Sequence, residues 1–223
     1  MSLAAPDGVT RVLLVRHGET NENVQGIVQG QLDTPLNAVG IQQAQRTGAA
    51  LQVEPVARII SSPLQRTRDT AHHIAAHHDV QIETDPRLME RCFGVLQGQV
   101  YRGPAQKPED TEGIEPSTAM RARLASFWDD LVADVRVSAP RLVVLVSHGG
   151  ALSTLVNQVL LTRGDVVLHE GLEPSRFWNC SITDIHLRAE EPGLIVRWAD
   201  TAHLEEATHV VNVDEAEPAP GNA

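Results

Sequence analysis

Two histidines in this chain each follow a short apolar run and precede a glycine. Val12–Val15 leads into Arg16-His17-Gly18, and Leu142–Val146 leads into Ser147-His148-Gly149. Runs of this length predict buried strands, and ligands bind where such strands end in open α/β sheets. If the two strands are neighbours in a parallel sheet, both imidazoles emerge at one edge, close to helix N-terminal amides that suit an anion. The spacing therefore predicts a phosphate site that contains two imidazoles and a guanidinium.

Two further segments supply groups that such a site needs. The stretch Ser61–Ala71 places Arg66 at another strand-to-helix junction, and Leu88–Gly94 places Glu90 in a loop-like segment. Guanidinium forks match the non-bridging oxygens of a phosphate, and a carboxyl group can exchange protons with an ester oxygen or with water. A single His-Gly turn is more often structural than catalytic. Its recurrence beside two arginines and a glutamate favours the catalytic interpretation.

With these motifs the chain resembles the histidine phosphatase superfamily, in the branch that also holds the cofactor-dependent phosphoglycerate mutases. The similarity runs from Arg11 to about Val211. It rests on five motifs in the family's order: Arg16-His17-Gly18-Glu19-Thr20 with Asn23, Ser61–Thr70, Glu90-Arg91 with Phe93-Gly94, Ser147-His148-Gly149-Gly150, and Asn179–Thr183. The closing Asp200–Leu204, followed by Val210-Val211, looks like the fungal broad-specificity phosphatase type. The resemblance implies a phosphatase with a phosphoglycerate mutase-like fold.

The resemblance also implies a role for each side chain. His17 would take the phosphoryl group and form a phosphohistidine, which divides one hard step into two easier ones. Arg16 and Arg66 would neutralise the non-bridging oxygens, and His148, if protonated, would add a third positive donor. Glu90 would protonate the leaving group and then activate water. The substrate-binding candidates that complete the phosphate cradle are Asn23, which also suits a turn, Gln29, Gly30 and Gly149. The expected substrate is a small phosphorylated metabolite.

A phosphoglycerate mutase and a non-catalytic binding or scaffold protein are the alternatives. In the mutases, the stretch between the acid and the second histidine is long and carries a tyrosine, a lysine and paired arginines. Here that stretch is short, Phe93 stands where the tyrosine would be, and Tyr101 stands near the lysine position. A site that cannot retain the bisphosphate intermediate admits water, so hydrolysis is expected. Scaffold relatives lack catalytic groups, whereas all five groups are present here.

Composition excludes several other classes of protein. A formal net charge of −11 argues against a nucleic-acid or membrane partner, because either requires a broad basic face. Cys92 and Cys180 form no C-x-x-C pair, so neither a disulfide framework nor a zinc knuckle is predicted. The histidines of the 72–78 segment include an i, i+4 pair without an evident third ligand. We therefore expect no metal, no cofactor and a cytoplasmic protein; the oligomeric state stays open, with a homodimer as one option.

The expected architecture is a three-layer α/β/α sandwich around a mostly parallel sheet of about six strands, with a hairpin at its edge. Aromatic residues make up only 3% of the chain, so aliphatic side chains must form the core. Strands are expected at 11–15, 57–61, 142–146, 179–188 and 194–200, helices at 37–52, 63–78, 117–136 and 151–161, and an irregular lid at 90–116. Residues 9–212 would form a single domain between a flexible N-terminus (1–8) and a disordered acidic tail (213–223).

Overall fold

One mostly parallel sheet forms the centre of the structure, a computed structural model that describes residues 8–101, 113–188 and 191–204. Within these residues, seven strands pair in the order β3-β2-β4-β1-β6-β7-β5. They are β1 (Thr10–Arg16), β2 (Val56–Ser61), β3 (Ile82–Thr84), β4 (Leu142–Ser147), β5 (Val166–Leu168), β6 (Ile182–Leu187) and β7 (Gly193–Asp200). Strands β1 to β4 pair in parallel, β6 is antiparallel to β1 and β7, and β5 is parallel to β7.

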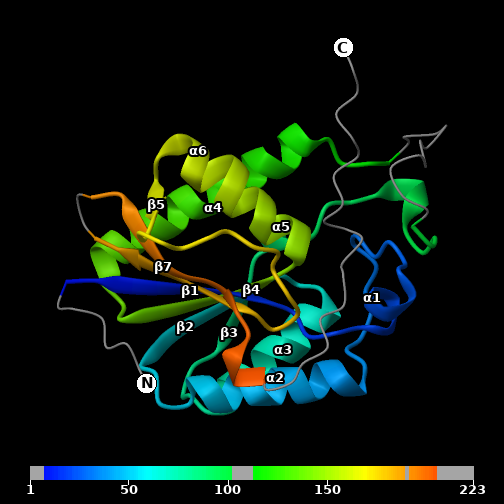
Figure 1. Cartoon of the computed structure of the whole chain (residues 1–223), viewed down its shortest axis with the longest axis horizontal. Coiled ribbons are helices and arrows are strands. Elements are labelled where there is room, and N and C mark those ends of the chain that lie inside the picture. The colour runs from blue at the N-terminus through cyan, green and yellow to red at the C-terminus, as the bar shows by residue number, and fades with distance from the viewer. Residues whose placement is uncertain (1–7, 102–112, 189–190, 205–223) are drawn as a thin grey trace.

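Helices cover both faces of this sheet and give the predicted three layers (Figure 1). One face carries α2 (Ala38–Leu51) and α3 (Gln65–Ala75), and the other carries α4 (Ser117–Ser138), α5 (Gly149–Ser153), the π-helical segment η3 (Thr154–Leu160) and α6 (Leu161–Arg163). Side chains of β1 alternate between the two cores, as the period of a strand requires. Leu13 and Val15 pack in the core under α2 and α3, whereas Val12 and Leu14 pack in the core under α4 and α5.

Four short elements complete the described chain: α1 (Asn21–Gln25) and the single-turn 3₁₀ helices η1 (Pro86–Leu88), η2 (Gly94–Leu96) and η4 (Ala202–Leu204). Asn37 caps α2 as predicted, because its side-chain oxygen accepts from the Gly40 amide at 2.8 Å. The predicted N-terminal segment before residue 8, the tail, Val210-Val211 and the centre of the lid lie outside the described residues.

Several boundaries differ from the sequence-based expectation. The predicted hairpin, β6 and β7, is not at the sheet edge, because β5 pairs outside β7. Strand β6 begins at Ile182 instead of Asn179, because Cys180 adopts a positive φ of 55° in a turn. Helix α3 begins at Gln65, since the residue before it is extended, and ends at Ala75. Pro116, not Ser117, precedes the first turn of α4, and no side chain caps it.

The connections after β1 and β4 leave the sheet on opposite faces. The chain passes from β1 through α1 to α2 on one face, and from β4 directly into α5 on the other (Figure 1). These two strands are parallel neighbours, so the crevice between their carboxyl ends is a topological switch point. Ligands of open α/β sheets bind at such points.

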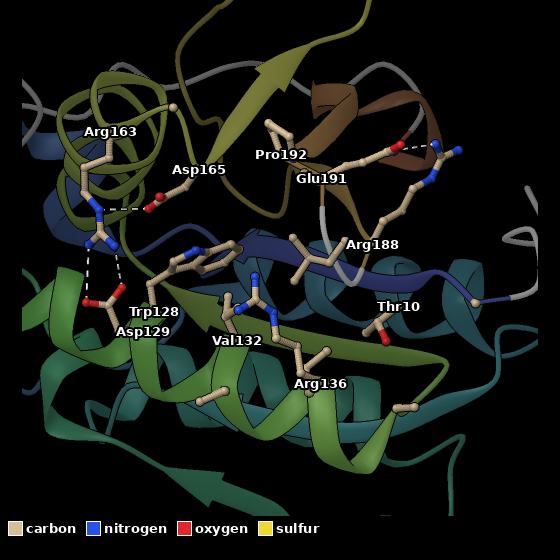
Figure 2. Close-up of a pocket in the computed structure, with 17 residues that line it drawn as sticks. Thr10, Trp128, Asp129, Val132, Arg136, Arg163, Asp165, Arg188, Glu191 and Pro192 are labelled. Carbon is tan, nitrogen blue, oxygen red and sulfur yellow. Dashed lines mark hydrogen bonds and ion pairs between the residues drawn. The ribbon is translucent and has the colours of Figure 1, made fainter.

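A cavity of about 610 Å³ lies at the opposite end of the sheet, beside Thr10 at the start of β1. Figure 2 shows Trp128 in its wall and Arg163 between two carboxylates. Arg163 pairs with Asp129 at 2.6 Å and with Asp165 at 3.0 Å. The cavity is therefore remote from both histidines. Among the described residues, no helix has the length and apolarity that crossing a membrane requires.

Candidate active site

His17 and His148 meet at the switch point. Arg16 pairs with Ser147 in the β1–β4 register, so the residue after each strand is a histidine. The His17 amide donates to the Ser147 carbonyl at 3.0 Å, and the two imidazole centroids lie 5.2 Å apart with the rings tilted by 59°. The prediction that the two histidines emerge at one sheet edge is confirmed.

The protonation state of His17 leaves a lone pair on Nε2. Its Nδ1 lies 2.7 Å from the Gly18 carbonyl oxygen, which can only accept, so Nδ1 carries the proton. Burial, followed by the charges of Arg66 and Arg16, holds the pKa of His17 well below its usual value. The imidazole is thus neutral near pH 7, with Nε2 available as a nucleophile.

The loop that carries His17 is packed tightly against neighbouring backbone. The Gly18 amide donates to Thr70 Oγ1 at 3.0 Å. A Cβ atom on Gly18 would lie 2.5 Å from the Gly40 carbonyl oxygen, and one on Gly40 would collide with Glu19. Only glycine permits this approach of the loop to α2. The position of His17 is therefore set by backbone packing as well as by the sheet.

Asn23 and Asn179 tie this loop to the last part of the chain. Asn23 forms a capping box with Thr20 at the start of α1. Its side-chain oxygen also accepts from Asn179 Nδ2 at 3.3 Å, and the same Nδ2 donates to the His17 carbonyl at 3.0 Å. The turn role that the sequence left open for Asn23 is thus present. Its predicted contact with substrate stays a prediction.

Two buried guanidinium groups flank the histidines. Arg16 donates to the Phe177 carbonyl at 2.7 Å, and Arg66, in the first turn of α3, donates to the carbonyls of Gly30 and Leu32, each at 2.7 Å. Both side chains are 1% exposed or less, so their charges act in a medium of low dielectric. An anion bound beside them would compensate these charges.

The Gln29–Gly30 segment supports Arg66 in the structure. The Gln29 side-chain oxygen accepts from Thr20 and Thr34 hydroxyls at 3.0 and 2.7 Å, which fixes the loop from inside. Gly30 adopts a positive φ of 50° and offers its carbonyl to the guanidinium. Gly30 therefore contacts the arginine, whereas the described contacts of Gln29 fix the loop, and direct contact of either residue with substrate stays a prediction.

His148 is buried beside Ser62. A hydrogen bond of 2.8 Å joins His148 Nε2 to Ser62 Oγ, and Nδ1 has no hydrogen-bond partner among the described residues. Burial, then the charge of Arg66 and further neighbouring cations, holds the pKa of His148 well below its usual value. This imidazole is therefore neutral near pH 7. The sequence allowed for a third positive charge if His148 were protonated, and this environment disfavours that protonation.

Glu90 reaches the site from the segment after η1. Its two carboxylate oxygens accept from the Arg91 amide at 2.8 Å and from the Gly150 amide at 2.9 Å. The side chain is 1% exposed. Gly150 follows Gly149, the first residue of α5, so the carboxylate lies at the same helix start as His148. These two amides fix the orientation of the carboxyl group.

Several residues of the site escaped sequence reasoning. Ser62, Thr70 and Asn179 lie inside recognised motifs, but their partners come from distant segments. In the sequence Gly150 is only the second member of a glycine pair, and its contact with Glu90 depends on the folded path of both segments. In the part of the chain that the structure describes, no group of histidine, cysteine and carboxylate side chains could hold a metal ion.

A family model for the histidine phosphatase superfamily (branch 1) matches residues 12–201. The chain belongs to this superfamily. The match contains each of the five groups described above. Membership makes the chain a phosphatase of this superfamily, and its relatives carry both phosphatase and mutase names.

Individual relatives cover most of the chain. A probable phosphoglycerate mutase GpmB of Yersinia enterocolitica is 34% identical over 218 residues, and the probable phosphatase C1687.21 of Schizosaccharomyces pombe is 31% identical over 203 residues. Each alignment covers 87% of this chain and 95% of the relative. The solved structure of a mycobacterial glucosyl-3-phosphoglycerate phosphatase with VO3 has a TM-score of 0.70 at 27% identity, and covers 86% of this chain and 100% of that one.

Proposed function

We propose that this phosphatase is a metal-independent phosphomonoester hydrolase that acts on small phosphorylated metabolites through a phosphohistidine on His17. One observation carries the proposal. The Gly18 carbonyl fixes the proton of a buried, neutral His17 on Nδ1, so Nε2 holds its lone pair next to two buried arginines. A nucleophile with positive charge around it suits a phosphate ester, whose transition state spreads negative charge over three oxygens.

In the first step, His17 Nε2 attacks phosphorus as the bond between phosphorus and the ester oxygen breaks. Glu90 in its protonated form gives its proton to the departing alkoxide. In the second step, the Glu90 carboxylate takes a proton from water, and the hydroxide oxygen bonds to phosphorus as the phosphorus–nitrogen bond breaks. Inorganic phosphate leaves, and both His17 and Glu90 return to their starting states. Arg16 and Arg66 compensate the charge of the phosphoryl oxygens throughout.

The site and its relatives support the proposed substrate class. The proposed donors bind a phosphoryl group and do not select the alcohol attached to it. The related mycobacterial structure is titled a glucosyl-3-phosphoglycerate phosphatase, which supports a small phosphorylated metabolite here as well. Two free cysteines, Cys92 and Cys180, suit a reducing compartment and support a cytoplasmic location.

A mutase is the second candidate, because the Yersinia relative carries that name. Against it, Phe93 packs its ring against the Arg91 guanidinium, 5.5 Å from the ring centroid, and brings no hydroxyl donor. A mutase must keep a bisphosphate bound while it turns over, which requires donors beyond the core. Assays of phosphoglycerate interconversion with added bisphosphoglycerate, beside phosphate release from a panel of phosphomonoesters, separate the two activities.

The covalent intermediate is tested directly with His17→Ala. Mixing the enzyme with ³²P-labelled substrate and stopping the reaction in alkaline detergent should trap label that survives base and is lost in acid. His17→Ala should trap none and lower kcat by at least about a thousandfold, as expected for a key group in phosphoryl transfer.

His169→Ala is the matched control for this test. Its Nδ1 also lies close to the next residue's carbonyl, 3.0 Å from Glu170 O, but the side chain is exposed, unlike the buried His17. The control should behave like the unmodified enzyme. Near-normal turnover in His17→Ala would refute the proposal.

A further inference from the structure

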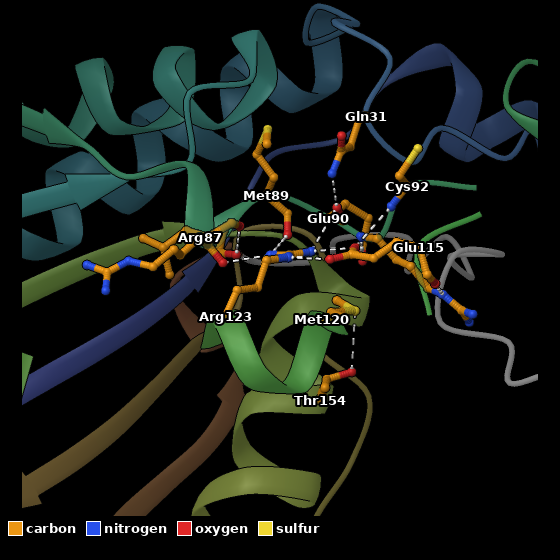
Figure 3. Close-up of polar contacts among 12 residues, drawn as sticks. Gln31, Arg87, Met89, Glu90, Cys92, Glu115, Met120, Arg123 and Thr154 are labelled. Atoms are coloured by element: carbon orange, nitrogen blue, oxygen red, sulfur yellow. Dashed lines mark hydrogen bonds and ion pairs between the residues drawn. The ribbon is translucent and has the colours of Figure 1, made fainter. Parts of the chain in front are cut away.

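The segment that carries Glu90 is held by one arginine of α4. Arg123 Nη1 donates to the carbonyls of Arg87 at 2.6 Å and Met89 at 2.7 Å, and Nη2 donates to the Glu90 carbonyl at 3.2 Å. Figure 3 shows this guanidinium lying under the chain that leads to Glu90. Three carbonyls, that of Arg87 in η1 and those of Met89 and Glu90 just after it, thus share one planar donor group. Such charge-assisted bonds are stronger than bonds between neutral groups.

Glu115 holds the same arginine from the other side. Its carboxylate accepts from Arg123 Nε at 2.6 Å and from Nη2 at 2.9 Å, a bidentate pair. The Glu115 carbonyl accepts from Arg91 Nε at 2.7 Å, and its carboxylate also lies 3.3 Å from the Cys92 amide. The residues on both sides of Glu90 are therefore tied to the ion pair. Both side chains are less than a fifth exposed, so water screens the pair little.

We propose that Arg123 and Glu115 are positioning residues that set the location of the Glu90 carboxyl group for proton transfer. The proposal rests on the function proposed above, in which Glu90 is the proton donor. Neither side chain contacts the reacting groups in the structure. They act through the backbone segment that carries Glu90. A misplacement of about 1 Å at a catalytic group can lower a rate by about a hundredfold.

The geometry explains why arginine is needed at this position. Three carbonyls and a carboxylate are bound at once, which requires several donors in one plane. A lysine ammonium offers three donors around a point and cannot reproduce the fork. Arg123→Lys therefore keeps the charge and loses the geometry, whereas Glu115→Gln keeps Arg123 but removes its charged partner.

The test compares kcat/KM for substrates with different leaving groups. If Arg123 and Glu115 only stabilised the fold, the loss of activity would not depend on the leaving group. For an enzyme with a covalent intermediate, kcat/KM reports the steps up to release of the alcohol. An alkyl phosphate needs a proton for that step, whereas para-nitrophenyl phosphate departs without one. We expect Arg123→Lys and Glu115→Gln to lower kcat/KM roughly tenfold to a hundredfold more for the alkyl phosphate than for the nitrophenyl ester.

A double-mutant cycle with Glu90→Gln tests the same point independently. If Arg123 acts through Glu90, adding Arg123→Lys to Glu90→Gln should cost almost nothing further on the alkyl phosphate. Arg163→Gln is the matched control, because it breaks an ion pair with Asp129. Asp129 lies on α4, as Arg123 does, but at the other end of the sheet. This control should leave kcat/KM unchanged for both substrates.

Each outcome bears on the proposal. Equal losses on the two substrates, or losses that add to those of Glu90→Gln, would assign the ion pair to fold stability alone and overturn it. If Arg123→Lys does not fold, Glu115→Gln carries the same comparison with the arginine in place. Absence of a trapped phosphoenzyme in the unmodified protein would instead refute the proposed function, so the two failures are distinguishable.

Discussion

Gly150→Ala should separate catalysis from stability at the Glu90 site. A Cβ atom at this position would lie 2.6 Å from Glu90 Oε1 and 3.0 Å from Oε2. Ordinary van der Waals contact begins at 3.4 Å, so the carboxylate must retreat by about 0.8 Å, the difference between 3.4 and 2.6 Å. The retreating atoms are the end of a flexible side chain, so the backbone need not move.

The two expected effects have opposite signs. Alanine is favoured over glycine in the middle of a helix by roughly 0.5–1 kcal/mol, and Gly150 is the second residue of α5, so the variant should keep its stability or gain part of this amount. A displacement close to 1 Å at the proton donor should lower kcat/KM for an alkyl phosphate by roughly tenfold to a hundredfold. Para-nitrophenyl phosphate should be affected much less, because its leaving group needs no proton.

The assay pairs kcat/KM on the two esters with the unfolding midpoint in urea. Ser153→Ala, later in the same helix, adds no atom toward Glu90 and should leave all three measurements unchanged. Unaltered turnover of the alkyl phosphate by Gly150→Ala would refute the reasoning, because the carboxylate could then move without consequence. A large loss of stability would refute it as well, since it would mean that the backbone moves instead of the Glu90 carboxylate.

The remaining predictions concern pH and metals. Burial and the Arg66 charge lower the pKa of both His17 and His148, so below about pH 6.5 the unfolded chain binds protons that the native site does not. The free energy of unfolding should therefore fall as pH drops through this range, by up to about 1.4 kcal/mol per pH unit for each histidine. Urea titrations at several pH values measure how steeply the free energy of unfolding changes with pH. His148→Asn should remove the contribution of one histidine from this slope, and a slope unchanged by the substitution would contradict the prediction. Dialysis against a chelator should leave activity intact because arginines supply the positive charge, and loss of activity restored by magnesium or zinc would count against it.

The sequence predicted the pairing of the two histidines because each follows an apolar run of its own. Strands of that length carry a clear signal, and adjacency of β1 and β4 then brings His17 and His148 to one edge. The same reasoning failed for β3 and β5, which have three residues each and no readable periodicity. Without β5, the hairpin was assigned to the edge of the sheet.

Roles that depend on contacts between distant segments could not be predicted in the same way. Arg123 looks like any exposed helical arginine in the sequence, because its acceptors are backbone carbonyls that carry no residue signature. Whether His148 is protonated could not be predicted either, because the sequence shows a basic neighbourhood but not the burial that opposes another charge. Glu90 came from family resemblance, and its orientation by Gly150 became visible only in the fold.

The place of β1 in the sheet also bears on how the protein is made. β1 is the first strand of the described chain, yet both of its neighbours, β4 and β6, come much later. About 125 residues separate Arg16 from Leu142, a stretch that ribosomes take on the order of ten seconds to translate. During that time the nascent apolar segment Val12–Val15 lacks both of the strands that pair with it in the native state. The central strand of the active site therefore stays without its strand partners during much of synthesis, an interval in which chaperones can shield it.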